Sequence, residues 1–184
     1  MKSICVFCSS SDSIDEVYFK IAIDLGYQIG NLNLDLVYGG GAIGLMGAVA
    51  RSVHKNGGRV VGVFPEFLRE KAKEFEYVDA DELIIAETMR IRKAIMDKRA
   101  DAFIALPGGI GTLEEAIEIM SMKQLGLTDK PLVFINTNNF YDDLISIFQK
   151  MVDLKFAEAS ILNSFAVCPN PSSALKFIFS SKSK

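Results

Sequence analysis

The chain has 184 residues, which is enough for one domain that buries a hydrophobic core without cross-links. Its 20 basic and 23 acidic side chains give a net charge of −3, which excludes the strongly basic surface of a nucleic-acid-binding protein. The amino terminus is too polar for a signal peptide, and no apolar run is long enough to cross a membrane. We therefore expect a cytoplasmic protein that binds neither nucleic acid nor membranes.

The three cysteines, an odd number, argue against a disulfide framework. Cys5 and Cys8 form a C-x-x-C, but they lie within and at the end of an apolar strand pattern, whereas redox pairs lie at the start of a helix. His54, the only histidine, falls on a helix face that we expect to be exposed. We therefore predict structural thiols and no metal site.

Short β-type segments alternate with longer helical segments along the chain. Strands are predicted at residues 3–8, 34–39, 59–64, 82–87, 102–107, 131–136 and 164–168, and helices at 15–31, 43–56, 88–99, 112–125, 141–154 and 172–179. Continuous apolar strands separated by helices are typical of a parallel sheet that is covered on both faces. The pattern predicts a doubly wound α/β fold, with one domain over residues 1–180 and a disordered tail over 181–184.

Ligands of such sheets bind beyond the carboxyl ends of the strands, where two glycine-rich turns occur. The first turn, "YGGGAIGLMG", places Gly39, Gly41 and Gly44 in a G-x-G-x-x-G pattern that suits either a phosphate or close packing of helix on sheet. An NAD site is poorly supported, because the pattern follows the second strand and Glu66 is the only acidic residue near the expected ribose contact. A P-loop is excluded, since no G-K-[ST] follows either turn.

The second turn, "LPGGIGTLEE", leaves two roles open for Glu115. If Thr112 is the N-cap of the following helix, Glu115 occupies the third helical position and completes a capping box. A cap does not require three glycines and a proline before it, so a role in chemistry stays open. Together, two glycine turns at one sheet edge indicate a nucleotide-sized site.

Arg92 falls in the middle of an apolar helical arc, and this arc also holds Ile91, Ile95, Met96, Met89 and Ala100. A buried arginine requires a carboxylate or a ligand phosphate as its partner. The alternative is a side chain that extends along the apolar face to reach water. Nothing marks Lys93 or Lys98 as a desolvated Schiff-base lysine, so we do not expect decarboxylase chemistry of that kind.

Two further stretches concern the surface. The mixed-charge run from Arg69 to Glu76 predicts a solvated segment. Ile119 and Met122 form a second apolar side of the helix that carries Glu115, and this side is a candidate seat for another subunit.

At this point the residues resemble a known family. "PGGIGTLEE" is similar to the P-G-G-x-G-T-x-x-E signature of the Lonely Guy (LOG) cytokinin-activating phosphoribohydrolases, long mislabelled lysine decarboxylases, and "MRIRKAIM" is similar to their second signature. "VYGGGAIGLMG", "VVGVFP", "ADAFIALPGG" and "KQLGLTDKPLVFIN" match in order and spacing, so the resemblance covers essentially the whole chain.

The resemblance implies a Rossmann-like nucleotide-binding domain, usually dimeric, that hydrolyses the N-glycosidic bond of adenosine or cytokinin riboside 5′-monophosphates. The products are the free base and ribose 5-phosphate, and we expect no cofactor. A nucleotide or molybdenum-cofactor carrier on the same scaffold is the alternative, against which the presence of both Arg92 and Glu115 argues.

The resemblance also implies which residues act. Arg92 and Glu115 fall on the catalytic positions, and the expected substrate-binding residues are Lys93, Gly108, Gly109, Ile110, Gly111, Thr112, Gly41 and Met89. A fixed carboxylate can stabilise the cationic ribose of the transition state and orient water, and we expect an ordinary pKa for it. Four positions depart from the family's common residues and bear on the base pocket: Ser9, Arg90, Ile110 and Met122.

Overall fold

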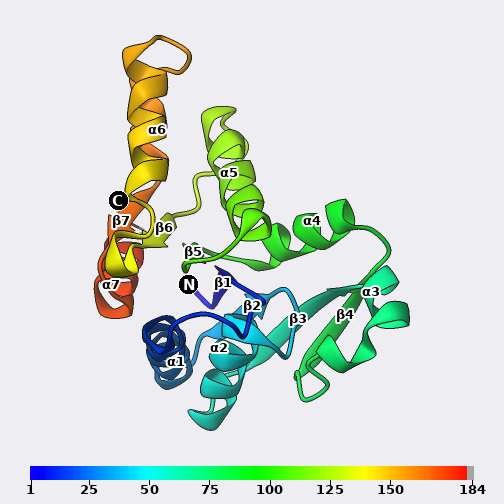
Figure 1. Cartoon of the computed structure of the whole chain (residues 1–184). Coiled ribbons are helices and arrows are strands. Elements are labelled where there is room, and N and C mark those ends of the chain that lie inside the picture. Colours follow the sequence, from blue (N-terminus) through cyan, green and yellow to red (C-terminus); the bar gives the residue numbers. More distant parts are fainter. Residues whose placement is uncertain (182–184) are drawn as a thin grey trace.

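Seven parallel strands form a single sheet in the order β4-β3-β2-β1-β5-β6-β7 (Figure 1). The computed structural model describes residues 1–181. The strands are β1 (Ser3–Phe7), β2 (Asp35–Tyr38), β3 (Val60–Pro65), β4 (Glu82–Ala86), β5 (Phe103–Ala105), β6 (Leu132–Ile135) and β7 (Ala166–Cys168). All seven predicted strands are therefore confirmed, together with their parallel pairing.

The helices connect successive strands as expected for a doubly wound fold. They are α1 (Glu16–Asn31), α2 (Gly44–Lys55), α3 (Glu66–Lys71), α4 (Met89–Arg99), α5 (Ile110–Gln124), α6 (Asp142–Asp153) and α7 (Pro171–Ser181). The short helix α3 was not predicted, because the mixed charges of its sequence have no apolar periodicity. Helix α7 continues through Ser181, which the sequence assigned to the tail, and residues 182–184 lie outside the described part of the chain.

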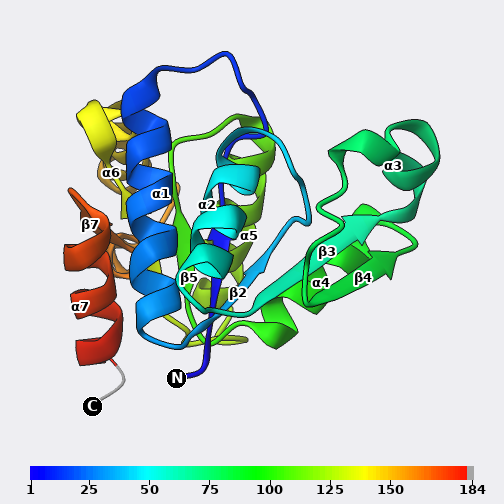
Figure 2. The same ribbon diagram turned by 90° about the horizontal axis from the view of Figure 1, so that it is seen from below.

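Helices cover both faces of the sheet (Figures 1 and 2). One core cluster joins the sheet to α1, α2 and α7 through side chains such as Leu25, Val49 and Leu175, and the other joins it to α4, α5 and α6. Alternate residues of each central strand belong to opposite clusters. In β1, Ile4 lies in the first cluster and Cys5 in the second. The strands read as continuous apolar runs because both of their faces are buried.

The direction of strand addition reverses at β1. From β1 the chain adds β2, β3 and β4 on one side, and then β5, β6 and β7 on the other. The loops that follow β1 and β5 therefore diverge at the carboxyl edge of the sheet, which is where ligands of such sheets bind.

Three expectations about single residues can now be compared with the structure. Cys5, Cys8 and Cys168 are free and buried, as predicted for structural thiols. His54, expected on an exposed face, is only partly exposed, with 24% of its side chain accessible and both ring nitrogens engaged in hydrogen bonds. The proposed seat for another subunit is also wrong, since Ile119 is buried and Met122 packs against the same core of its own chain.

Candidate active site

A buried ion pair joins α4 to α5 at the carboxyl edge of the sheet. Arg92 Nη1 donates a hydrogen bond of 2.8 Å to Glu115 Oε1, and Arg92 Nε donates one of 2.9 Å to the backbone oxygen of Val63 in β3. Arg92 is only 7% exposed. The alternative in which Arg92 reaches out to water is therefore wrong, and the guanidinium has the anionic partner that its burial requires.

The capping-box interpretation of Glu115 is also wrong. Helix α5 begins at Ile110 with Gly109 as its N-cap, so Thr112 is the third helical residue and Glu115 the sixth. A residue in the second turn cannot reach back to the N-cap amide. The carboxylate of Glu115 contacts Arg92 instead, and its side chain is 12% exposed.

The environment of Glu115 shifts its titration. Burial raises the pKa of this carboxyl, and the positive charge and hydrogen bond of Arg92 lower it; the net result is a pKa above the ordinary value, not the ordinary one expected from sequence. The carboxylate is thus a stronger base than an exposed glutamate. It is held in one orientation by a partner that is itself fixed to β3.

The turn after β2 brings glycine against the guanidinium. A Cβ atom at Gly39 would lie 2.1 Å from Arg92 Nη2, so no larger residue fits while Arg92 keeps this position. The turn continues into α2, whose first amides are already engaged: Gly44 N–H donates to Asp12 Oδ1 at 2.8 Å and Leu45 N–H to the Ser9 oxygen at 2.9 Å. The structure therefore favours the packing role of this turn over phosphate binding.

The turn after β5 is different, because the start of α5 is open. Among residues 1–181, no acceptor receives a hydrogen bond from the backbone amides of Ile110, Gly111 or Thr112. A Cβ atom at Gly109 or Gly111 would meet nothing within 4 Å. Free amides at a helix start favour an anion, and the missing side chains leave space for it.

Other predicted residues of this turn have distinct positions. Gly108 packs closely on Thr112, since a Cβ there would lie 2.2 Å from Thr112 Oγ1. Ile110 is 82% exposed at the first position of α5. The turn therefore combines one glycine required for packing with an open surface.

Lys93 lies beside the buried pair, but its ammonium group pairs with other carboxylates. Its ammonium pairs with Glu114 and with Glu118 Oε2, the latter at 2.9 Å, and its side chain is 14% exposed. Burial lowers the pKa of Lys93, but the two carboxylates outweigh it and leave the pKa above its ordinary value. Glu118, one turn beyond Glu115 on α5, thus contacts Lys93.

An apolar pocket of about 310 Å³ has Arg92 as part of its lining. Its lining includes the predicted residues Gly41 and Met89. Gly39 lines it as well, and the other lining residues were not predicted from the sequence: Ser10, Ile43, Met46, Phe64, Pro65, Leu68 and Phe75. Ser10 and Ile43 could have been found, because they follow β1 and β2 at the carboxyl edge. Phe75 lies in the run from Arg69 to Glu76 that was expected to be solvated, and Leu68 immediately precedes that run.

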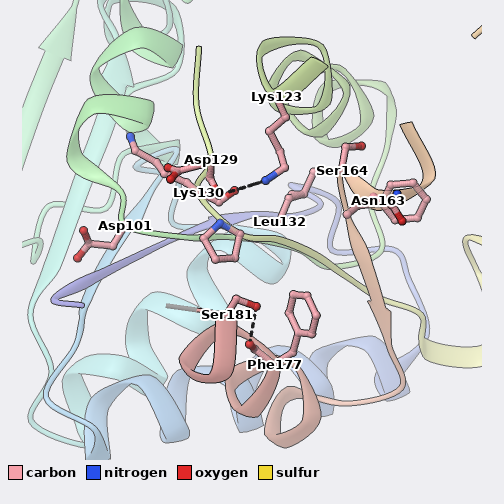
Figure 3. Close-up of a pocket in the computed structure, with 11 residues that line it drawn as sticks. Asp101, Lys123, Asp129, Lys130, Leu132, Asn163, Ser164, Phe177 and Ser181 are labelled. Carbon is pink, nitrogen blue, oxygen red and sulfur yellow. Dashed lines mark hydrogen bonds between the residues drawn. The ribbon is translucent and has the colours of Figure 1, made fainter. Parts of the chain in front are cut away.

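A larger cavity, of about 610 Å³, lies near the amino ends of β5, β6 and β7 (Figure 3). Lys123 there donates hydrogen bonds to the backbone oxygens of Asp129 and Lys130. None of the predicted site residues lines this cavity. Size alone therefore does not identify the site of chemistry.

Residues 1–181 contain neither a cluster of metal-binding side chains nor a membrane-spanning helix. No cluster of three or more histidine, cysteine, aspartate or glutamate side chains there could hold a metal ion. None of the helices in that range has the length and apolarity needed to cross a membrane.

Comparison with known proteins assigns the family. Residues 46–178 match the family described as "Possible lysine decarboxylase". The chain is 40% identical over 177 residues to cytokinin riboside 5′-monophosphate phosphoribohydrolase LOG2 of Arabidopsis thaliana, covering 96% of this chain and 82% of the relative. It is 43% identical over 169 residues to the phosphoribohydrolase LOG5 of the same plant, covering 92% and 73% of the two chains.

Solved structures share the fold. The molybdenum cofactor carrier protein of Chlamydomonas reinhardtii matches with a TM-score of 0.75 and 21% identity, covering 100% of this chain and 99% of that one. The molybdenum cofactor binding protein of Rippkaea orientalis matches with a TM-score of 0.73 and 21% identity, covering 98% and 97%. Both confirm the Rossmann-like fold, and the sequence relatives carry the assignment: the chain belongs to the LOG family of phosphoribohydrolases.

Proposed function

We propose that this protein hydrolyses the N-glycosidic bond of adenosine or cytokinin riboside 5′-monophosphates, releasing the free base and ribose 5-phosphate. The observation that carries the proposal is the buried Arg92–Glu115 pair, located between the open start of α5 and an apolar pocket. Membership of a family whose relatives are named phosphoribohydrolases supports it.

The chemistry requires a fixed negative charge beside the ribose. As the bond between C1′ and the base nitrogen breaks, its electron pair leaves with the base and positive charge develops on the ribose. The carboxylate of Glu115 stabilises that charge and orients a water molecule, whose oxygen bonds to C1′. Glu115 takes one proton of this water, the departing base nitrogen takes up one proton from solvent, and Glu115 then releases its own proton to solvent, which restores the carboxylate. Arg92 keeps the carboxylate in place.

The phosphate of the nucleotide is charged and its base is largely apolar. The Arg92–Glu115 pair likewise has free backbone amides on one side and an apolar pocket on the other. We place the phosphate on the amides of Ile110, Gly111 and Thr112, next to Gly108 and Gly109, and the base in the apolar pocket with Gly41 and Met89. Lys93 adds positive charge on the side of α5. The apolar lining favours an adenine with a prenyl group on N6 over plain AMP.

A carrier of nucleotides or of the molybdenum cofactor is a weaker alternative. Its support is fold similarity at 21% identity. A carrier has no need of a carboxylate buried against arginine with a raised pKa, because such a group costs free energy that binding alone does not require.

We further propose that the protein is a cytoplasmic homodimer. Apolar side chains remain exposed on α4 and on α5 with the turn after it, and they include Ile91, Ile117 and Leu125. Light scattering coupled to size-exclusion chromatography tests this, and a mass near the 20.2 kDa of one chain would contradict it.

The function is tested by incubating the purified protein with AMP, with isopentenyladenosine 5′-monophosphate and with the two ribosides that lack phosphate. Chromatography of the products should show free base from the monophosphates and none from the ribosides. Binding of the nucleotides without release of base would instead support the carrier.

A further inference from the structure

The outer wall of the apolar pocket belongs to a segment that crosses from β3 to β4. This segment, residues 66–80, contains α3 and a short 3-10 turn, Lys73–Phe75, and we refer to it as the strap. It lies at the edge of the molecule formed by β3 and β4 (Figure 2). Leu68 and Phe75 of the strap line the pocket together with Arg92 and Met46. The strap therefore decides how far the apolar space extends beyond Arg92.

The strap is fastened to the first glycine turn through its backbone. Ala42 N–H donates a hydrogen bond of 2.7 Å to the oxygen of Phe75, and Tyr77 N–H donates one of 2.9 Å to the oxygen of Gly40. Inside the strap, Arg69 Nε lies 3.0 Å from Glu76 Oε2, whose side chain is only 3% exposed. Most of the mixed-charge run from Arg69 to Glu76 is exposed, as expected, but Glu76 is buried and Phe75 lines the pocket.

A side-chain network fixes the end of the strap to α2. His54 Nδ1 lies 2.9 Å from the hydroxyl of Tyr77, and His54 Nε2 lies 2.8 Å from Asp81 Oδ2. The two rings also stack, with centroids 5.6 Å apart. Asp81 in turn accepts a hydrogen bond of 2.7 Å from Val60 N–H at the start of β3.

The polarity of the network follows from its members. The Val60 amide and then His54 hold the pKa of Asp81 below its ordinary value, so its carboxylate is an acceptor. In neutral His54, Nε2 then carries the proton and Nδ1 accepts from the Tyr77 hydroxyl. Tyr77, His54 and Asp81 thus form one chain of hydrogen bonds from the strap to the sheet.

We propose that Leu68 and Phe75 determine specificity for an apolar substituent on the base, and that Tyr77, His54 and Asp81 are positioning residues that hold the strap against it. This inference rests on the proposed hydrolysis of nucleoside 5′-monophosphates. Leu68 and Phe75 would contact the substituent, and both belong to the strap, whose position depends on the network. Plain AMP, which lacks the substituent, does not use the wall.

The positioning role is tested with Tyr77→Phe, which removes one hydroxyl and keeps the ring stacked on His54. We expect hydrogen exchange of the backbone amides of residues 66–80 to rise about fivefold, because one hydrogen bond of ordinary net strength is lost. KM for isopentenyladenosine 5′-monophosphate should rise about as much, with kcat and both constants for AMP nearly unchanged. Tyr27→Phe, the same change on exposed α1, is the control. Unchanged exchange, or an equal rise in KM for AMP, would overturn the role.

The specificity role is tested with Phe75→Ala, whose side chain is partly exposed and can be truncated without opening the core. We expect KM for the prenylated nucleotide to rise about tenfold and KM for AMP to stay within about twofold. Equal effects on the two nucleotides would overturn this role.

Failure of the proposed function would look different, because wild-type protein would then release no base from either nucleotide. In that case calorimetry still tests whether Leu68 and Phe75 contact the substituent, because it measures the Kd of each nucleotide without turnover. A prenylated nucleotide that binds wild type more tightly than Phe75→Ala supports the wall. Equal binding to the two proteins, or no binding of either nucleotide, overturns it.

Discussion

The guanidinium of Arg92 and the carboxylate of Glu115 lie 2.8 Å apart and are almost completely shielded from water. The arginine is fixed at its other edge by the Val63 oxygen, and the Gly39 turn lies against it. The glutamate is therefore held by a partner that cannot easily move. Its pKa is nevertheless raised, because burial disfavours the charge more than Arg92 favours it.

Glu115→Gln should abolish most hydrolysis and leave the fold intact. Glutamine can still accept the hydrogen bond of Arg92 but lacks the charge that stabilises the transition state, so kcat should fall by roughly 100- to 1,000-fold. Thermal unfolding should occur near the wild-type temperature. Glu114→Gln, the same change at an exposed neighbour, is the matched control and should retain activity. Full activity in Glu115→Gln would refute the catalytic role.

Arg92→Ala should damage both stability and activity. It leaves the Glu115 carboxylate buried without a partner, and loss of one member of a buried pair costs about 3 kcal/mol of unfolding free energy. The double variant Arg92→Ala/Glu115→Gln should be more stable than Arg92→Ala alone, because it buries no unpaired charge. Denaturant unfolding of the four proteins measures this, and strictly additive losses would contradict it.

The raised pKa of Glu115 predicts the pH dependence of activity. Hydrolysis needs the ionised carboxylate, so kcat/KM should fall as pH decreases through a value above about 4.3, where an ordinary glutamate titrates. The residual activity of Glu115→Gln should lack this limb.

The same shift sets the sign for stability. A carboxyl whose pKa is raised by folding contributes stability below its unfolded pKa, and this contribution is lost as pH rises through the folded pKa. Glu115→Gln should therefore be at least as stable as wild type at neutral pH, and should lose any such advantage below about pH 4. Unfolding curves of both proteins at the two pH values test this prediction. A larger stability advantage of Glu115→Gln in acid than at neutral pH would contradict it.

Substitutions at two glycines of the turn after β5 should have different effects, one on stability and the other on substrate binding. Gly111→Ala places its Cβ in open space within α5, so stability should stay the same or rise slightly, while the added methyl group raises KM. Gly108→Ala collides with Thr112 and should lower the unfolding temperature. The melting temperature and KM of both variants test these two roles. A destabilised Gly111→Ala would be inconsistent with the open space around Gly111.

The sequence predicted the sheet well because strands such as β1, β3 and β6 are buried on both faces and read as unbroken apolar runs. It also singled out Arg92 and Glu115, the first from its position on an apolar arc and both from the family resemblance. It could not reveal that they contact each other, because only folding brings the side chains of α4 within hydrogen-bonding distance of those of α5.

The errors have physical causes too. The T-x-x-E pattern suggested an N-cap at Thr112, but the N-cap of α5 is Gly109, three residues earlier. The strap was missed because its order comes from backbone hydrogen bonds to the Gly40 turn and from His54, and neither leaves a periodic pattern in the sequence.

The most direct test is hydrolysis of isopentenyladenosine 5′-monophosphate in water labelled with oxygen-18, with the products analysed by mass spectrometry. The account predicts equal amounts of free base and ribose 5-phosphate, with one labelled oxygen on the sugar at C1 and none in the phosphate, and loss of this product in Glu115→Gln. Label in released phosphate with the riboside left intact, or no release of base by the wild-type protein, would contradict it.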